Sequence, residues 1–285
     1  MVVPSLGRSC LAETLSFVEG WDFSPVEVLV VLPADTNFTI AFFESSLKLI
    51  EVRASRGQVS QRIEGFRRAT GKLVLQLDDD ILIDNESISL LISAVNKFGI
   101  CAVAPSMYRY PSIEPWVRLT DVGFTGLRHS VLRRVLGAGS LRESMGRVSR
   151  AGVAFPLDPT LISSDILEVD WTPGGALLHH RRNLITESYF PYQGRASHED
   201  LFHSHILRSA GVKILTVRSA RAYQFFEYRE ESFSSIFREL MINFDFVKLY
   251  GYSKFRFSLW VFYRFFIECT RRVISRFKSR QSSRP

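Results

Sequence analysis

Three consecutive aspartates, Asp78, Asp79 and Asp80, directly follow the apolar segment Leu73–Leu77. Carboxylates this close together repel one another and raise one another's pKa, so a cation is expected beside them. A hard divalent ion such as Mg²⁺ or Mn²⁺ prefers carboxylate oxygens and can also hold the diphosphate of a nucleotide. The alternative is a solvated acidic turn with a helix cap. The apolar segment favours the ion, because sites gather at strand ends in α/β sheets.

A second pair of carboxylates, Glu199 and Asp200, lies about 120 residues downstream of the triplet. A carboxylate in a site can act as a general base that takes a proton from an attacking hydroxyl group. The pair also suits a structural role, because Ser197-x-x-Asp200 approximates a capping box and acidic side chains are favoured in the first turn of a helix. The presence of the triplet in the same chain favours the chemical role.

Further polar and glycine residues lie between or beside these carboxylates. His198 could approach a diphosphate or a metal ion, although histidines that pack helices or face solvent are commoner. Gly174 and Gly175 let the backbone approach a ligand closely, or form a simple tight turn. The basic run 179–182 predicts a turn that either neutralises a diphosphate or is solvated.

Apolar and amphipathic segments alternate over the first 105 residues, which predicts a β-α-β-α-β order. The predicted strands are Val26–Leu32, Leu47–Val52, Lys72–Leu77 and Ile100–Ala104. The predicted helices span 58–69 and 88–98, and glycines follow both where helices commonly stop. Such alternation favours a mostly parallel sheet with flanking helices, in which ligands bind beyond the carboxyl ends of the strands. We therefore expect Asp78–Asp80 at such an end.

The remainder of the chain is less regular. Residues 105–168 are rich in Gly, Ser, Arg and Pro and are weakly periodic, which predicts loops and short helices. Beyond them we predict a strand at Ile166–Trp171, a helix from Glu199 to Ala210 and a strand at Val212–Val217. No repeat and no linker divides the chain cleanly.

Composition limits the class of protein. A chain of 285 residues with 46% hydrophobic and 23% charged residues is typical of a folded globular protein. Its three cysteines are an odd number at wide spacing, which fits neither a disulfide framework nor a zinc site and favours a reducing compartment. The first eight residues lack the features of a secretory signal. These observations predict a cytoplasmic protein.

The positive charge of the chain is concentrated near its C-terminal end. The net charge is +7, yet residues 251–285 contain nine Lys and Arg against one glutamate. Aromatic residues alternate with these cations, which is typical of an amphipathic helix lying on an anionic membrane surface. The alternative is a core-packing helix with a basic end. The aromatic-apolar stretch 255–267 contains thirteen residues, fewer than the roughly 20 that span a bilayer.

Nucleic-acid binding is the competing explanation for a sequence pI of 9.5. Aromatic side chains can stack on bases and cations can bind phosphates. However, the first 250 residues are close to neutral and their candidate site is acidic. We therefore expect no nucleic-acid partner.

One segment resembles a known enzyme family. Residues 56–80 read Arg56-Gly57-Gln58, Gln61-Arg62-Ile63-Glu64-Gly65, Ala69-Thr70-Gly71, the apolar strand and the aspartates. This order resembles the core of inverting family-2 glycosyltransferases with the GT-A (Rossmann-like) fold. Residues 2–8, 28–35, 171–177 and 198–200 resemble the family's first strand, second strand, acceptor-side glycine turn and Glu-Asp motif. The resemblance covers residues 1–220, with Ile63 in place of the family's usual asparagine.

The resemblance implies a role for each motif. Nucleotide-sugar binding is implied for Asp35, Arg62, Asp78 and Asp79, the first two at the base; Mn²⁺ or Mg²⁺ binding is implied for Asp80 and Asp78. Acceptor binding is implied for Trp171, Gly174, Gly175 and Glu199, and the catalytic base is Asp200. His198 is a possible contact to the diphosphate or metal.

The expected protein is therefore a metal-dependent inverting glycosyltransferase. Its donor is a nucleotide-sugar, and its acceptor is a saccharide or lipid-linked saccharide, as in cell-surface polysaccharide assembly. Residues 1–220 form the expected GT-A domain, with a nucleotide half at 1–105 and an acceptor half at 106–220. Residues 221–285 form a basic, aromatic helical extension that associates with the inner face of the membrane. A sugar nucleotidyltransferase is the alternative enzyme, although its glycine-rich phosphate loop is missing from the first strand.

Overall fold

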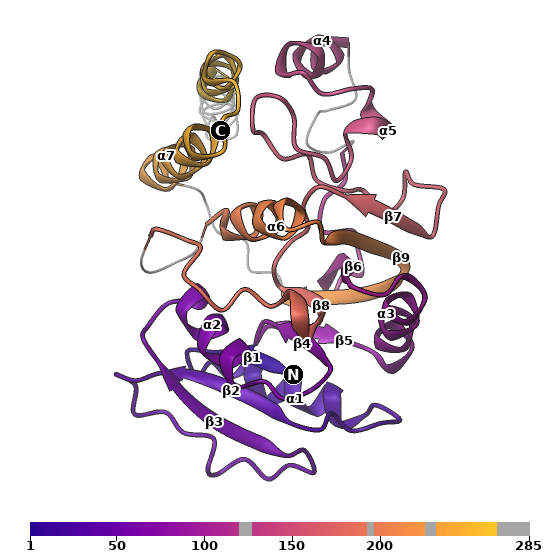
Figure 1. The fold of residues 1–285 in the computed structure, drawn as a ribbon, viewed down its shortest axis with the longest axis vertical. Helices are drawn as coiled ribbons and strands as arrows, with labels where there is room; N and C mark the ends of the chain where they lie inside the picture. Colours follow the sequence, from indigo (N-terminus) through magenta and orange to yellow (C-terminus); the bar gives the residue numbers. More distant parts are fainter. Residues whose placement is uncertain (120–126, 193–196, 226–231, 267–285) are drawn as a thin grey trace, which may run out of the picture.

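A computed structural model describes residues 1–119, 127–192, 197–225 and 232–266. One nine-stranded sheet runs through the molecule, and helices pack on both of its faces (Figure 1). The strands are β1 Val2–Pro4, β2 Val28–Pro33, β3 Leu49–Ala54, β4 Leu73–Leu77, β5 Ile81–Ile83, β6 Cys101–Tyr110, β7 Ile166–Val169, β8 Ala176–His180 and β9 Lys213–Phe225. The helices are α1 Cys10–Glu19, α2 Gln58–Arg68, α3 Asn85–Phe98, α4 Leu127–Leu136, α5 Leu141–Ser144, the 3₁₀ turn Arg181–Asn183, α6 Glu199–Ser209 and α7 Phe233–Leu249, followed by a helical segment at 254–266.

The strand order is β3-β2-β1-β4-β8-β6-β9-β5, and β7 also pairs with β9. Strands β3, β2, β1 and β4 are parallel neighbours, and β6 is parallel to β9. Strand β8 lies between β4 and β6 and is antiparallel to both, so β6 runs in the same direction as β4. The sheet of this mixed α/β fold is therefore mostly parallel, with β5, β7 and β8 running the opposite way.

Successive side chains of a strand point to opposite faces, so each face of the sheet collects its own helices. On one face, Leu11 and Leu15 of α1 and Leu91 of α3 pack with the apolar strand residues. On the other, Phe66 of α2 packs on β1, β2 and β4, and Leu207 of α6 packs on β6 and β8. Helices α2 and α6 consequently lie side by side over the central strands.

Local sequence signals explain where the helices near the site begin and end. Helix α3 begins after Asp84, whose carboxylate accepts a hydrogen bond from the Ser87 amide at 2.7 Å. It ends at Gly99, whose φ of 77° lies in the region that favours glycine. Helix α2 follows Gly57, with a φ of 137°. The predicted helices at 58–69, 88–98 and 199–210 are confirmed within two or three residues.

Several elements differ from the sequence prediction. Strands β6 and β9 continue to Tyr110 and Phe225, well beyond the predicted ends. Helix α1 and the short strand β5 were not predicted. The prediction of a basic turn at 179–182 is wrong at its start, because His179 lies in β8 and is fully buried. Strand β8 is flanked by β4 and β6, which leaves no solvent on either edge.

Helices α4 and α7 and the 254–266 segment lie at one end of the molecule, and β3 lies at the other (Figure 1). A third apolar cluster joins them, formed by Leu136 of α4, Val247 of α7 and Trp260. None of the helices in the described ranges combines the length and apolar character that crossing a bilayer requires.

Candidate active site

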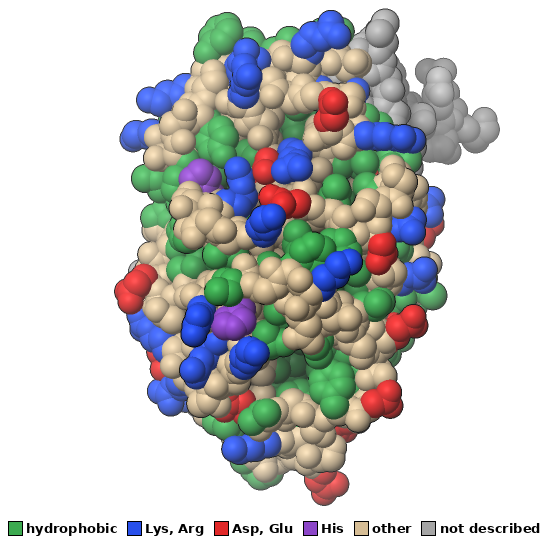
Figure 2. Space-filling model, turned by 45° about the vertical axis from the view of Figure 1, so that its right-hand side comes forward, with side chains coloured by type: hydrophobic (Ala, Val, Ile, Leu, Met, Phe, Trp, Pro, Cys, Tyr) green, Lys and Arg blue, Asp and Glu red, His purple; other side chains and the backbone are tan. Residues whose placement is uncertain are grey.

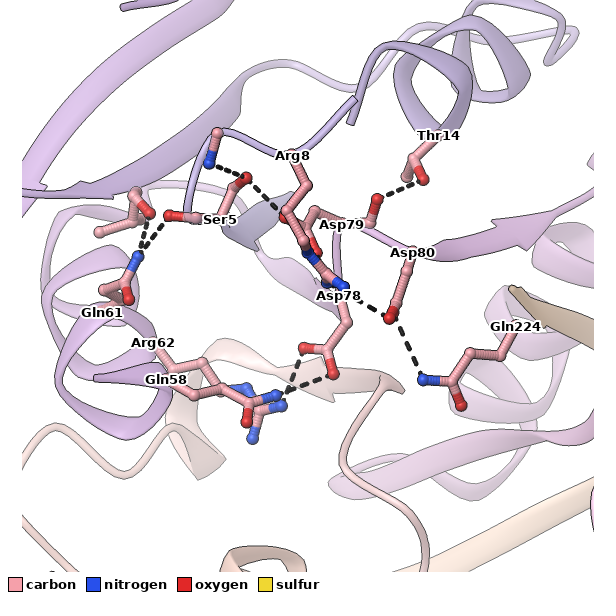
Figure 3. Close-up of polar contacts among 12 residues, drawn as sticks. Ser5, Arg8, Thr14, Gln58, Gln61, Arg62, Asp78, Asp79, Asp80 and Gln224 are labelled. Atoms are coloured by element: carbon pink, nitrogen blue, oxygen red, sulfur yellow. Dashed lines mark hydrogen bonds and ion pairs between the residues drawn. The ribbon is translucent and has the colours of Figure 1, made fainter. Parts of the chain in front are cut away.

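The aspartate triplet lies where β4 ends, beside the loop that follows β1 and the start of α2 (Figure 3). The Asp78 amide donates to the Gly175 carbonyl at 2.8 Å, which fixes the chain as it leaves the sheet. Buried Gln61 of α2 donates to the Ser5 carbonyl at 2.8 Å and the Val31 carbonyl at 2.6 Å. These two bonds tie the β1 loop and β2 to helix α2.

Asp78 faces helix α2. Its Oδ1 accepts from the Arg62 guanidinium at 2.8 Å and its Oδ2 from the Gln58 amide at 2.9 Å. The side chain is 16% exposed. Burial raises the Asp78 pKa to about 6, and the charge of Arg62 opposes that rise.

Asp79 faces the β1 loop and is buried. Its Oδ2 accepts from the Ser5 hydroxyl at 2.6 Å, and its Oδ1 pairs with Arg8. Its backbone carbonyl accepts from the Thr14 hydroxyl of α1 at 2.9 Å. These contacts tie β4, the β1 loop and α1 together.

Asp80 faces β9. Its Oδ2 lies 3.2 Å from the Arg8 guanidinium, and its Oδ1 lies 3.4 Å from the Gln224 amide nitrogen. The Phe225 amide donates to the Asp80 carbonyl at 3.0 Å, so the end of β9 is anchored to the triplet. Asp78 therefore contacts α2, whereas Asp79 and Asp80 share the Arg8 guanidinium, as Figure 3 shows.

Glu199 and the triplet are connected by a single side chain, Arg62. Arg62 is 1% exposed and donates one guanidinium nitrogen to Asp78 and another to Glu199. The second Glu199 oxygen accepts from the Tyr189 hydroxyl at 3.0 Å. Because Asp78 and Glu199 share one guanidinium, the two carboxylate groups predicted from sequence lie at one site.

Asp200 follows Glu199 in the first turn of α6. Its Oδ1 accepts from the Leu201 amide at 2.9 Å. The helix begins at His198, which has a φ of 62° and no side-chain capping bond, so the proposed capping role of Ser197-x-x-Asp200 is not the arrangement found. Burial and the neighbouring Glu199 charge raise the Asp200 pKa to about 7. Burial and the nearby charge of Arg264 lower the His198 pKa to about 4.

The two glycines before β8 are required by close packing. A Cβ on Gly174 would lie 2.7 Å from the Glu199 carboxylate, and a Cβ on Gly175 would lie 2.3 Å from the Ile81 side chain. A larger residue would require the Glu199 carboxylate or the Ile81 side chain to move. Trp171 is partly buried and donates from its indole nitrogen to the Phe155 carbonyl at 3.0 Å.

The model of glycosyl transferase family 2 matches residues 1–147, more than half of the chain. The chain belongs to glycosyl transferase family 2. No curated protein sequence matches it.

Solved glycosyltransferase structures share the fold of this family member. GalNAc-T7 with UDP, GalNAc and Mn²⁺ aligns over 85% of this chain and 47% of its own, with a TM-score of 0.57 and 15% identity. The 1–349 portion of S. aureus TarS with UDP-GlcNAc aligns over 85% and 63%, at a TM-score of 0.53 and 14% identity. PcManGT of Pyrobaculum calidifontis with GDP-Man and Mn²⁺ aligns over 86% and 62%, at 0.51 and 18%. The chain spans less than two thirds of each, and these likenesses establish the GT-A fold.

The side chains around Asp80 suit a divalent ion whose coordination shell is completed by a bound ligand. Within the described residues no group of three or more His, Cys, Asp or Glu side chains is arranged to hold a metal ion. The carboxylates of Asp80 and Asp78 nevertheless offer hard oxygen ligands, whereas the Gln224 amide presents its nitrogen to Asp80 as a hydrogen-bond donor. Mg²⁺ in proteins commonly takes one or two carboxylates and completes its shell with phosphates and water. The chemistry of these side chains therefore suits an ion shared with a diphosphate.

Two predicted base contacts lie in different surroundings. Asp35 is exposed and pairs with Arg56 at 2.9 Å. Arg62 is buried between two carboxylates. Contact of either residue with the nucleotide base stays a prediction. The observed contacts of Arg62 are with Asp78 and Glu199, which it bridges.

Sequence reasoning assigned no role to Arg8, Gln224 or Tyr189. Arg8 lies in the short loop after the first strand, and a cation there could have been matched to the triplet. Gln224 lies 144 residues from Asp80 and beyond the predicted end of its strand. Tyr189 carries no local signal, because its hydroxyl is placed by a segment outside regular structure.

Proposed function

We propose that this protein is a metal-dependent inverting glycosyltransferase that moves a sugar from a nucleotide-sugar to a saccharide or lipid-linked saccharide. The observation that carries the proposal is the Arg62 bridge. Arg62 contacts both Asp78 of the triplet and Glu199. The aspartates suited to donor binding and the carboxylate pair proposed to supply a base therefore lie on either side of one guanidinium group.

The donor is held at the edge formed by β4 and the β1 loop. Asp80 would hold a divalent ion, which would supply positive charge for the departing diphosphate. Asp78 is engaged by Arg62 and Gln58, which suits a fixed carboxylate that binds the nucleotide-sugar. Buried Asp79 shapes the loop that borders the donor.

Asp200 is the proposed general base. In an inverting transfer, the acceptor hydroxyl attacks the anomeric carbon from the face opposite the leaving nucleotide and gives up its proton. An ordinary carboxylate is a weak base, whereas a pKa of about 7 makes Asp200 an effective proton acceptor near neutral pH. Glu199, Gly174, Gly175 and Trp171 border the acceptor side, and His198 stays a possible diphosphate contact.

Nucleotide binding gives the first test. Calorimetry and thermal shift with UDP, GDP and dTDP, each with and without Mn²⁺, should identify one nucleotide that binds in a metal-dependent manner. The corresponding nucleotide-sugar should then be turned over, and NMR of the product should show an inverted anomeric configuration. A folded protein that binds none of the three nucleotides contradicts the donor proposal, and a retained configuration contradicts the inverting mechanism alone.

The helical end of the molecule is the proposed membrane contact. Phe255 and Phe262 of the 254–266 segment are each 73% exposed, and Leu249 of α7 is 64% exposed. Exposed aromatic and apolar side chains beside a strongly basic segment suit anionic lipid headgroups. This surface would place a lipid-linked acceptor at the inner face of the membrane, on the side of the protein where α6 and α7 meet.

Vesicle sedimentation tests this surface. The full chain should sediment with phosphatidylglycerol vesicles and much less with phosphatidylcholine vesicles. The double change Phe255→Ser and Phe262→Ser should reduce the bound fraction several-fold. The control is Phe42→Ser, because Phe42 is 87% exposed but lies between β2 and β3. Equal loss in both variants, or no preference for the anionic lipid, argues against the membrane contact.

A further inference from the structure

Arg8 reaches the triplet from the solvent side. It lies in the loop after β1, and its guanidinium points down between Asp79 and Asp80 (Figure 3). It pairs with the Asp79 Oδ1 atom and lies 3.2 Å from the Asp80 Oδ2 atom. Its side chain is 51% exposed. One half-exposed cation therefore neutralises two of the three adjacent carboxylates.

Arg8 and Arg62 differ in how firmly they are held. Arg62 is 1% exposed and is fixed between carboxylates from two different elements. Removing it from its partners would leave buried charges uncompensated. Arg8 is half-exposed, so water or another anion can replace its 3.2 Å contact with Asp80 while its pair with buried Asp79 is kept. Of these two arginines, Arg8 is therefore the one that can move during a binding event.

The position of Arg8 conflicts with a cation on Asp80. A Mg²⁺ ion would lie about 2.0–2.1 Å from a ligating carboxylate oxygen. The Asp80 Oδ2 atom already has a guanidinium nitrogen at 3.2 Å. Two cations on the same carboxylate repel each other unless an anion lies between them. The diphosphate of the donor is an anion that could bind both.

We propose that Arg8 is a built-in counter-ion that holds Asp79 and Asp80 in the donor-free protein and competes with the divalent ion for Asp80. When the ion and the donor enter together, the Arg8 guanidinium moves from Asp80 to the diphosphate. The identity of the donor rests on the proposed function, whereas the competition between Arg8 and the ion rests on the observed contacts alone.

This exchange makes ion and nucleotide binding cooperative. The ion alone must displace Arg8 and tolerate its charge, so it binds weakly. With a nucleoside diphosphate present, the displaced guanidinium gains a new anionic partner. Coupling between two ligands is reciprocal. The ion therefore raises the affinity for the nucleotide by the same factor by which the nucleotide raises the affinity for the ion. The acidic triplet also stays neutralised whether or not a donor is bound.

Mn²⁺ binding to Arg8 variants tests the proposal. The free Mn²⁺ concentration is followed by electron paramagnetic resonance, first without nucleotide and then with the nucleoside diphosphate that binds the wild type. Arg8→Gln should bind Mn²⁺ alone about tenfold more tightly than the wild type, because a nearby positive charge is removed. Its Mn²⁺ affinity should respond less to nucleotide. Arg8→Lys keeps the charge, so its affinity for Mn²⁺ without nucleotide should stay within about twofold of the wild-type affinity.

Arg68→Gln is the matched control, because Arg68 is 57% exposed and also pairs with a carboxylate, Glu64, but lies outside the triplet. It should leave Mn²⁺ binding unchanged. Mn²⁺ affinity of Arg8→Gln that equals or falls below that of the wild type overturns the proposal. If no nucleoside diphosphate binds the wild type, the donor proposal fails, while the comparison in Mn²⁺ alone still decides the role of Arg8.

A measurement on the wild type covers the case in which Arg8→Gln does not fold. Circular dichroism establishes whether the variant is folded. In the wild-type protein, Mg²⁺ together with the nucleoside diphosphate should shift the Arg8 Nε–H resonance in the NMR spectrum. A resonance that stays unchanged on saturation with both ligands also overturns the exchange.

Discussion

Asp80 and Asp200 belong to one site but have different neighbours. The triplet that contains Asp80 is surrounded by donors, with Arg8 on Asp79 and Asp80, Arg62 on Asp78, and side-chain amides beside them. Asp200 accepts from a backbone amide and has the negative charge of Glu199 next to it. Burial raises the pKa of both aspartates, but Arg8 and the Gln224 amide oppose the rise at Asp80, whereas the charge of Glu199 adds to the rise at Asp200. The different neighbours match the two proposed roles, ion binding at Asp80 and base catalysis at Asp200.

The largest expected effect comes from Asp200→Asn. Loss of a general base typically costs a factor of about 10²–10⁴ in rate. We expect nucleotide affinity to stay within about twofold, and the melting temperature not to fall, because the change removes a charge whose burial is unfavourable. Initial rates of nucleoside diphosphate release and calorimetry measure the two quantities. Asp22→Asn, at an exposed aspartate, is the control; a matching loss of nucleotide binding in Asp200→Asn would place Asp200 with the binding group instead.

Arg62→Met should have the next largest effect, on stability. It leaves Asp78 and Glu199 buried without their shared cation, and breaking such a pair costs about 3–5 kcal/mol. Urea unfolding measures the loss. Arg68→Met removes an exposed pair and should cost about 0–1 kcal/mol. Similar losses in the two variants would show that the bridge does not hold the two carboxylate groups together.

Within the triplet, Asp80→Asn and Asp79→Asn should separate binding from structure. Asp80→Asn should weaken metal-dependent nucleotide binding by roughly tenfold to a hundredfold while leaving unfolding almost unchanged, since one of the ion's few protein ligands is lost. Asp79→Asn should instead cost about 1–3 kcal/mol of stability, because hydrogen bonds to its buried carboxylate are weakened. Calorimetry and urea unfolding on both variants give the comparison, and an interchange of the two effects would reverse their roles.

The smallest expected effect is a shift in pH dependence. Asp200 has a pKa of about 7, and the proposed base is its deprotonated form, so kcat/KM should rise with pH through about 7. Glu199→Gln removes a negative charge that raises this pKa, so the rising limb should move to lower pH. Rates at saturating metal between pH 5.5 and 8.5 measure the shift. If the rising limb moves to higher pH or stays in place, the charge of Glu199 does not raise the Asp200 pKa.

Local patterns predicted the elements that carry the main motifs. The spacing of Val59, Ile63 and Phe66 gave α2, and all three side chains are buried as the periodicity requires. An apolar run before the aspartates gave β4 and located the triplet at its end. These predictions succeeded because the periodicity of a single segment determines the result.

The contacts that give each carboxylate its character were beyond local reasoning. Arg8 meets Asp79 across 71 residues, and Arg62 meets Glu199 across 137. Such pairings depend on strand order, and the antiparallel insertion of β8 between β4 and β6 has no counterpart in the alternating pattern. The three-residue strand β5 is too short for a period to be recognised. The division into a 1–220 domain and an extension stays a prediction.

The insertion of β8 also bears on how the chain folds as it is synthesised. Strands β4 and β6 are complete by Tyr110, but both pair with β8, which begins at Ala176. A nascent chain ending between these points exposes two unpaired apolar strand edges at the centre of the future sheet, and such edges promote aggregation. The gap between β4 and β6 therefore closes only when the five-residue strand β8 is made, and fragments truncated before it should be prone to aggregate.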